Sequence, residues 1–215
     1  MNLAEYITIR EVGARDGLQA EAPLSVDDRL ELLDALLAAG LTHLEVAAFV
    51  SPKAVPAMAD AAEVVAGFGA PEGVVRAALV PNVRGAELAL AAGVDELTVT
   101  ISASATYNDR NVHMTIDESV EAIAAICALA APAGVPVDAV ISCAFGSPYE
   151  GDISPAVVGL LAERLRASGA AAITLADTTG MATPRRIRDV LALTSANVGL
   201  HLHETRGTGL LNAYA

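Results

Sequence analysis

The sequence predicts an α/β fold of the TIM (β/α)8 barrel class, with a single domain over residues 1–215. A recurring unit, in which a helical stretch ends in glycine and a short apolar run follows, predicts alternating helices and strands. The runs are β-branched and almost continuously apolar, which is typical of parallel strands buried on both faces. No glycine-rich nucleotide-binding loop accompanies them, and this favours a barrel over a doubly wound sheet.

Seven strands are expected, at residues 6–12, 43–49, 74–80, 94–101, 135–142, 171–176 and 198–203. Helices are expected between them, and four of these helices end at a glycine that is free to adopt a positive φ. These glycines are Gly40, Gly93, Gly134 and Gly169. Only ETRGTGLLNAYA follows the seventh strand, so we expect the eighth strand and helix of a barrel of about 250 residues to be missing.

Four helix starts carry residues that cap a first turn. A hydroxyl residue followed three positions later by an acidic residue predicts a capping box, at Ser25 with Asp28 and at Thr115 with Glu118. A hydroxyl residue before proline predicts a helix that begins at the proline, at Ser154-Pro155 and at Thr183-Pro184.

Charge and hydropathy exclude several classes of protein. The 13 basic and 26 acidic residues give a net charge of −13 with no basic stripe, so no nucleic-acid partner is expected. No apolar run reaches the about 18 residues of a membrane span, and the N-terminal residues lack the pattern of an export signal. We therefore expect a cytoplasmic protein without a membrane partner, whose two cysteines, Cys127 and Cys143, are free thiols.

The sharpest local pattern is the pair of histidines on the seventh expected strand, His201 and His203. Residues two apart on a strand point to the same face, so both imidazoles can share a metal ion at the mouth of a barrel. The alternative is that one histidine packs in the core and the other binds a loop. Asp16, which follows the first strand, favours the metal, and Asp with two His suits Mg²⁺ or Mn²⁺ and also Co²⁺ or Zn²⁺.

Three charged residues beside this pattern are candidates for catalysis. Arg15 next to Asp16 is placed to stabilise a developing enolate or oxyanion, or it forms an ordinary surface salt bridge. Glu45 lies within an apolar strand, where a carboxylate is costly unless it is paired, and Arg15 is its expected partner. Asp177 ends the sixth strand. Three roles are equally open for it: a catalytic base, a residue that orients a histidine, or a cap for the next turn.

Five segments, in order, resemble motifs of the hydroxymethylglutaryl-CoA lyase family. They are EVGARDGLQAE (11–21), FVSPKAVPAMAD (49–60), ISCAFGSPYEGDISP (141–155), LADTTGMATP (175–184) and GLHLHETRGTGLLN (199–212). The resemblance runs collinearly from residue 7 to the C-terminus. Related isopropylmalate and homocitrate synthases usually have Glu where this chain has Leu18, so the resemblance favours the lyases.

The resemblance implies a metal-dependent barrel enzyme that acts on an acyl-CoA and is homo-oligomeric when full length. Asp16, His201 and His203 would bind Mg²⁺ or Mn²⁺, and Arg15 would face the thioester carbonyl. Glu45 and Asp177 would line the site, and Gln19 and Ser142 would contact the substrate. The family reaction cleaves the C2–C3 bond of a 3-hydroxy-3-methylglutaryl thioester to acetoacetate and acetyl-CoA, a step of leucine degradation and ketone-body formation.

Two departures from the family pattern bear on activity. The family's catalytic cysteine loop and a fourth ligand, an Asn, would lie beyond residue 215, so residues 1–215 alone are expected to lack lyase activity. Glu-Thr-Arg-Gly-Thr-Gly follows His203 where the better-known lyases more often have Asp-Thr-Tyr-Gly-Gln, which leaves a related 3-hydroxyacyl-CoA open as the substrate.

Two other functions stay open. A metal-dependent barrel hydrolase also uses His-x-His, but typically on its first strand and with a metal-binding lysine, whereas Lys53 is the single lysine here. A non-catalytic fragment that keeps the fold is the alternative outside the enzymes. A glycine-rich cysteine loop downstream would favour the lyase.

Overall fold

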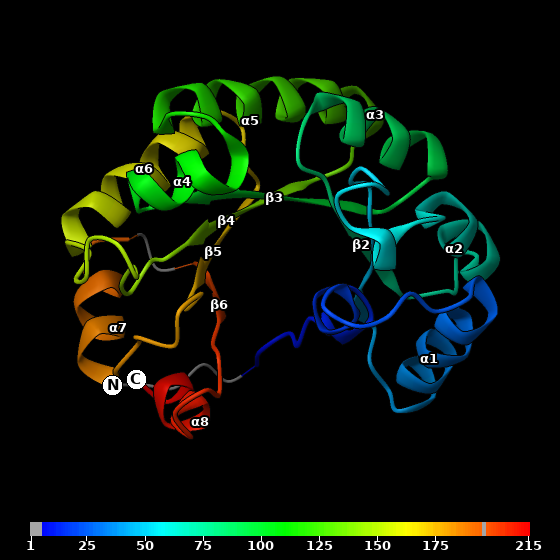
Figure 1. Cartoon of the computed structure of the whole chain (residues 1–215), viewed down its shortest axis with the longest axis horizontal. Helices are drawn as coiled ribbons and strands as arrows, with labels where there is room; N and C mark the ends of the chain where they lie inside the picture. The colour runs from blue at the N-terminus through cyan, green and yellow to red at the C-terminus, as the bar shows by residue number, and fades with distance from the viewer. Residues whose placement is uncertain (1–5, 195–196) are drawn as a thin grey trace. The chain divides into compact units, whose positions relative to one another are not determined.

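The structure, a computed structural model, describes residues 6–194 and 197–215. A helix follows each strand along the chain, and the strands follow one another in the order β1 to β6 (Figure 1). The pairings β1–β2, β2–β3, β4–β5 and β5–β6 are parallel. Parallel strands in sequential order, alternating with helices, are the arrangement of a (β/α) barrel, so the predicted fold class is confirmed.

The described strands are β1 His43–Ala48, β2 Val75–Leu79, β3 Glu96–Ser102, β4 Val137–Ser142, β5 Ala172–Ala176 and β6 Gly199–His201. The α-helices are α1 Val26–Ala38, α2 Ala61–Phe68, α3 Val83–Ala92, α4 Ala105–Val112, α5 Ile116–Ala130, α6 Pro155–Ala167, α7 Pro184–Leu191 and α8 Gly209–Ala213. Three short helices complete them: η1 Gly13–Gly17, η2 Pro56–Met58 and η3 Ala131–Ala133.

The prediction of a strand at residues 6–12 is wrong, since the structure describes this segment and forms no strand there. This segment makes an isolated parallel bridge between Glu11 and Leu44, in which the Glu11 carbonyl accepts from the Glu45 backbone N–H at 2.8 Å. Its apolar side chains do not enter a core, since Ile7 is 77% exposed and Ile9 62% exposed. Because these side chains are exposed, they add none of the packing that would favour a strand here.

The chain divides into two compact units. The first comprises residues 1–98 and 129–136, and the second comprises residues 99–128 and 137–215. The single domain expected from the sequence stays a prediction.

In the first unit, β1 is the most buried element. Leu44 and Val46 are fully buried, and Leu33 of α1 is buried with them. The capping box of Ser25 with Asp28 is confirmed at the start of α1, where the Ser25 hydroxyl accepts from the Asp28 backbone N–H at 3.1 Å. The position of α1 in the sequence is therefore set by its cap as well as by its apolar face.

A buried arginine ties β2 to the loops around it. Arg76 is 7% exposed, and its guanidinium donates to the carbonyl oxygens of Gly69 and Gly93 and to the Asp95 carboxylate, the last at 2.8 Å. The hydrogen bond from Arg76 holds the pKa of Asp95 below its ordinary value. Because the guanidinium donates to three acceptor groups, its removal would leave these acceptors without their hydrogen bonds.

We expect Arg76→Met to lower the free energy of unfolding by about 2–3 kcal/mol at pH 7. This loss is smaller than that for a fully buried ion pair because the Asp95 side chain is 40% exposed to solvent. Ionised Asp95 stabilises the fold above its ordinary pKa of 3.8, and this contribution is lost as the pH falls through its lower folded pKa. Urea unfolding at pH 7 and pH 3 measures both effects. The control is Arg84→Met, since Arg84 is exposed, and an equal loss in both variants would contradict the prediction.

In the second unit, the predicted helix starts are confirmed with one difference. The Thr115 hydroxyl caps α5, with Glu118 bound in return, and the Thr183 hydroxyl accepts from the Arg186 backbone N–H at the start of α7. Helix α6 begins at Pro155 as expected, but the Ser154 side chain makes no capping hydrogen bond. Proline at the first helical position fixes φ by itself, so the helix can start there without the hydroxyl.

The predicted positive-φ glycines and free thiols are also confirmed. Gly40, Gly93, Gly134 and Gly169 have φ values of 90°, 79°, 68° and 99°. Cys127 and Cys143 are free and buried. A Cβ at Gly169 would lie 3.2 Å from the Cys127 Cβ, so this glycine also allows a close approach to α5.

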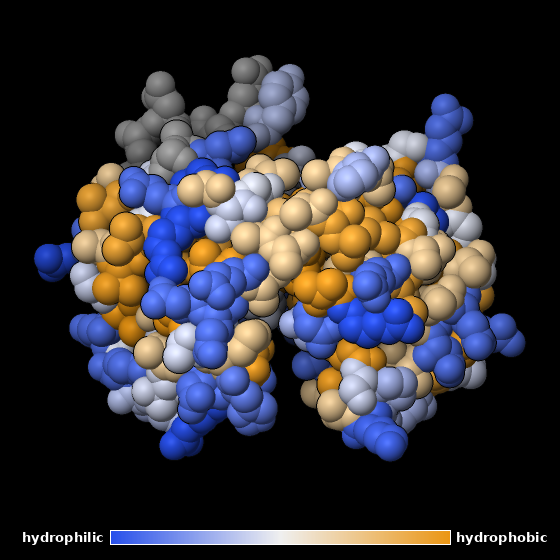
Figure 2. Space-filling view, turned by 90° about the horizontal axis from the view of Figure 1, so that it is seen from above, coloured by the Kyte–Doolittle hydropathy of each residue, from blue (hydrophilic) through white to orange (hydrophobic). Residues whose placement is uncertain are grey.

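The surface mixes polar and apolar side chains. On the face seen in Figure 2, hydrophobic residues lie among hydrophilic ones. Individual exposed leucines such as Leu160 on α6 are ordinary for a folded protein. Among the described residues, no helix has both the length and the apolar character needed to cross a bilayer.

Candidate active site

A widened helical turn presents Arg15 and Asp16. The segment Gly13–Gly17 forms one turn of π-helix, in which the Gly17 backbone N–H donates to the Val12 carbonyl at 3.4 Å. Such turns redirect the side chains they carry and are frequent at functional sites. The turn follows the segment that pairs with β1, so its side chains emerge at the carboxyl end of that segment.

The predicted pairing of Arg15 with Glu45 is confirmed within the first unit. Glu45 is 1% exposed on β1, and its Oε2 lies 2.8 Å from Nε and 2.6 Å from Nη2 of Arg15. The third guanidinium nitrogen, Nη1, donates to Asp16 Oδ1 at 2.8 Å. Two carboxylates therefore fix the plane of the guanidinium, which is 11% exposed at its side chain.

This arrangement leaves one buried acceptor without a partner. Glu45 Oε1 is buried and makes no hydrogen bond among the described residues. Asp16 is half-buried beside Arg15. Gln19 lies exposed just after the π-turn, and its predicted contact with substrate stays a prediction.

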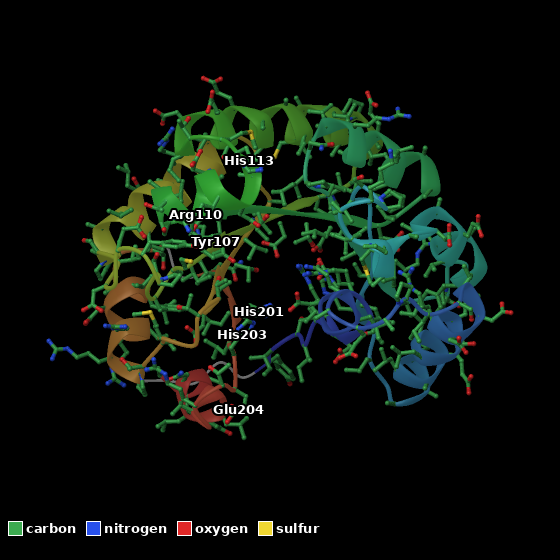
Figure 3. The ribbon with its side chains drawn as sticks, in the orientation of Figure 1. Tyr107, Arg110, His113, His201, His203 and Glu204 are labelled. Carbon is green, nitrogen blue, oxygen red and sulfur yellow. The ribbon has the colours of Figure 1, made fainter. Side chains whose placement is uncertain are left out.

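The two histidines come together in the second unit. His201 ends β6 and His203 follows two residues later, and their Nε2 atoms lie 3.1 Å apart with the rings edge to face. Figure 3 shows the two side chains adjacent to each other, with Glu204 farther away. Two imidazole nitrogens at this distance need either a shared proton or a cation between their lone pairs, so the pair fits a divalent metal.

Asp177 lies at the carboxyl end of β5, next to β6. Its backbone N–H donates to the His201 carbonyl at 2.8 Å, and its Oδ1 accepts from the Ala182 backbone N–H at 2.8 Å. The cap predicted as one of three roles is thus present, while Oδ2 is buried without a hydrogen bond among the described residues. Burial raises the pKa of Asp177, although backbone hydrogen bonds from Ala182 and Met181 offset part of the rise.

Ser142, expected to contact substrate, is half-buried at the end of β4. Its hydroxyl donates to the Ile101 carbonyl of β3 at 3.2 Å. The donor is therefore used within the sheet and only the oxygen lone pairs are available to a ligand. Its role in binding stays a prediction.

Sequence reasoning did not select Glu150 as a site residue, although its carboxylate joins two loops at the carboxyl ends of β3 and β4. Glu150 accepts from the hydroxyls of Ser104 and Ser147. Glu150 entered the sequence analysis only as part of the segment 141–155, through its resemblance to the lyase family. Ser104 is the N-cap of α4, but a capping serine needs no carboxylate, so no signal in the sequence identifies Glu150.

Comparison with known proteins agrees with these features. The family model described as HMGL-like matches residues 6–215. A 3-hydroxy-3-isohexenylglutaryl-CoA/hydroxymethylglutaryl-CoA lyase of Pseudomonas aeruginosa is 41% identical over 100% of this chain and 74% of its own length. The human mitochondrial hydroxymethylglutaryl-CoA lyase is 39% identical over 98% of this chain and 66% of its own length.

Solved structures give the same result. The crystal structure of the hydroxymethylglutaryl-CoA lyase of Pseudomonas aeruginosa has a TM-score of 0.94 and 41% identity, covering 100% of this chain and 73% of that one. An HMG-CoA lyase of Acinetobacter baumannii in complex with coenzyme A and 3-methylmalate has a TM-score of 0.89 and 37% identity, covering 96% and 70%. With a family match over almost its whole length, this chain belongs to the HMGL-like family, a divalent-metal-dependent family that includes the hydroxymethylglutaryl-CoA lyases.

Proposed function

We propose that the protein is a divalent-metal-dependent carbon–carbon lyase. Its substrate is 3-hydroxy-3-methylglutaryl-CoA or a close 3-hydroxyacyl-CoA, and its products are acetyl-CoA and acetoacetate or the matching keto acid. The observation that carries the proposal is the guanidinium of Arg15, which Glu45 and Asp16 hold in one plane. The two relatives reported above are named as hydroxymethylglutaryl-CoA lyases, which supports the same reaction.

The proposed metal ligands are Asp16, His201 and His203, with Mg²⁺ or Mn²⁺ as the ion. The adjacent Nε2 atoms of the two histidines support this assignment. Carboxylate and imidazole together suit several divalent ions, and the acyl substrate's own oxygens favour the harder ones. A bound divalent ion supplies Lewis acidity, which lowers the pKa of a coordinated hydroxyl group.

Arg15 is the proposed stabiliser of the enolate. Cleavage of the C2–C3 bond leaves its electron pair on C2 and the thioester carbonyl of acetyl-CoA. A guanidinium that is already held by two carboxylates reorganises little when this charge develops, which is the condition for strong transition-state stabilisation. Glu45 acts by orienting Arg15.

Asp177 is the proposed acceptor of the hydroxyl proton. Its Oδ2 is buried and unpaired among the described residues, while Oδ1 is fixed by the Ala182 N–H. A carboxylate that is fixed at one oxygen and open at the other can take a proton without moving. The proton that leaves the 3-hydroxyl group ends on Asp177, and the hydroxyl carbon becomes the ketone of the keto acid. The enolate then takes up a proton from solvent at C2 to give acetyl-CoA.

The range of acyl groups that the enzyme accepts is also part of the proposed function. The Pseudomonas aeruginosa relative is named for both the isohexenyl and the methyl substrate. Gln19 and Ser142 are proposed substrate contacts, and Arg206 and Thr208 are proposed to shape the acyl pocket. A cytoplasmic location and a homo-oligomeric state remain predictions from the sequence.

We expect the protein, purified in the full length that its gene encodes, to release acetyl-CoA from 3-hydroxy-3-methylglutaryl-CoA when Mg²⁺ or Mn²⁺ is present. A coupled assay for acetyl-CoA measures the rate, and removal of the ion with a chelator followed by its return tests the metal dependence. Release of free coenzyme A without acetyl-CoA would indicate thioester hydrolysis and contradict the proposal. So would turnover that is unchanged by the chelator.

A further inference from the structure

The Glu150 carboxylate is held by three donors from two segments of the second unit. Oε2 accepts from the hydroxyls of Ser104 and Ser147, each at 2.5 Å, and Oε1 accepts from the Thr106 backbone N–H at 3.1 Å. Ser104 and Ser147 are each 1% exposed, so both hydroxyls are shielded from water. Hydrogen bonds to an ionised carboxylate are about twice as strong as neutral ones.

These bonds join the start of α4 to the loop between β4 and α6. Ser104 is the N-cap of α4, and its hydroxyl also accepts from the Tyr107 backbone N–H at 3.0 Å. Ser147 and Gly151 close the other loop through paired backbone hydrogen bonds, which fixes Glu150 between them. The negative charge also faces the N-terminal end of a helix, where the backbone dipoles favour it.

The Glu150 carboxylate is ionised at neutral pH. Burial raises the pKa of Glu150, but the hydrogen bonds from Ser104, Ser147 and Thr106 outweigh burial and lower the pKa to about 2. The hydrogen bonds to Glu150 that join the two segments are therefore charge-assisted at neutral pH.

Two tyrosines stand on the braced segments. Tyr107 lies on α4 and Tyr149 directly precedes Glu150, and their ring centroids are 6.3 Å apart. The Arg110 guanidinium lies 4.5 Å from the centre of the Tyr149 ring, and Figure 3 shows Arg110 and Tyr107 on the same helix. Together with Asn111 these side chains line a pocket of about 200 Å³. One wall of the pocket, Tyr107, lies on the first segment that Glu150 joins, and the other wall, Tyr149, lies on the second. Glu150 therefore sets the distance between the two walls.

The pocket lies on segments that follow the carboxyl ends of β3 and β4, the ends at which (β/α) barrels bind their substrates. We propose that Glu150 is a positioning residue, which holds Tyr107 and Tyr149 in place to contact a non-reacting part of the acyl-CoA substrate. The proposal rests on the proposed lyase function. We expect these contacts to be made equally in the ground state and in the transition state, so their loss raises KM and leaves kcat unchanged.

The test compares Glu150→Gln with a matched control, Glu118→Gln. Glu118 is also a carboxylate that binds the N-terminal turn of a helix, α5, but it lies outside the pocket. We expect Glu150→Gln to raise KM about tenfold, the effect of one lost hydrogen-bonded contact, with kcat unchanged. Glu118→Gln is expected to leave both parameters unchanged, and Glu150→Asp to restore part of the loss.

Tyrosine spectroscopy gives a second readout. The chain has no tryptophan and four tyrosines, two of them in this pocket, so near-ultraviolet circular dichroism reports largely on Tyr107 and Tyr149. We expect Glu150→Gln to change this signal and Glu118→Gln to preserve it. If Glu150→Gln does not fold, Tyr149→Ala removes one wall without touching the brace, since Tyr149 is 45% exposed, and it is expected to raise KM as well.

An unchanged KM in Tyr149→Ala, or in folded Glu150→Gln, would overturn the inference, as would a loss confined to kcat. Calorimetric binding of acetyl-CoA gives the same comparison between variants without turnover. An inactive wild-type protein that binds acetyl-CoA more tightly than Glu150→Gln would refute the lyase function and support the role of Glu150. Equal binding by both would overturn that role.

Discussion

Arg15→Gln is expected to lower kcat by about 10²–10³, the usual cost of losing one preorganised donor at a developing oxyanion. Arg15 is oriented by Glu45 and Asp16 before substrate binds, so its positive charge is in place when the enolate forms. A glutamine can still donate one hydrogen bond, but it carries no charge and cannot satisfy both carboxylates.

The fold also responds to this change, because Glu45 is 1% exposed and Arg15 is its partner. A buried carboxylate without its cation commonly costs about 3–5 kcal/mol, so Arg15→Gln is expected to lower the unfolding temperature as well. The double variant Arg15→Gln with Glu45→Gln removes both charges and should recover stability without recovering kcat. This separates the electrostatic role of Arg15 in turnover from its role in the fold.

Steady-state kinetics with 3-hydroxy-3-methylglutaryl-CoA and thermal unfolding by circular dichroism measure the two effects. Arg84→Gln is the control, since Arg84 is an exposed arginine of α3 whose ion pair with Glu87 lies within one helix turn. A kcat near the wild-type value in folded Arg15→Gln would remove Arg15 from the mechanism.

The pairing of Arg15 with Glu45 could be predicted because burial of a carboxylate has few solutions. A glutamate inside an apolar strand must find a cation or donors, and Arg15, next to a candidate metal ligand, is a charged donor in the preceding segment. The histidine pair was predictable for a similar reason, since alternation along a strand puts i and i+2 on one face. Both predictions depend on local geometry and on the cost of desolvation.

The predicted strand at residues 6–12 shows the limit of pattern reasoning. Its short run of β-branched and apolar residues is typical of a strand, but such a run reports only a preference for a packed, buried position. Whether the ladder forms depends on neighbours on both sides, and in the described structure the segment bridges β1 at Glu11 alone.

The brace at Glu150 was missed because its partners come from distant parts of the sequence. Ser104 is 46 residues away, and neither residue carries a pattern that specifies the other. Side-chain hydrogen bonds between loops follow from how the helices and strands place the loops, which the periodicity of the sequence does not encode. Helix starts were predictable because capping is local, within three residues of the cap.

His203→Ala is expected to abolish lyase turnover. It is also expected to weaken metal binding by more than about 10–100-fold, which is the usual loss when a residue that only supports a metal ligand is replaced. The Nε2 atoms of His201 and His203 lie 3.1 Å apart, so removal of one imidazole deletes half of the nitrogen donor pair in the second unit. The change is expected to spare the fold, because His203 is half-buried and lies beyond the end of β6.

The measurement is Mn²⁺ binding by isothermal titration calorimetry, paired with acetyl-CoA release under saturating metal. His113→Ala is the matched control, since His113 is an exposed histidine at the C-terminal end of α4 and lies apart from the pair in Figure 3. Two imidazoles that were joined only by a shared proton would not need a metal, and His203→Ala would then bind Mn²⁺ as the wild type does. That result would leave the histidine pair as a structural hydrogen bond and would refute its assignment as the nitrogen donors of the lyase.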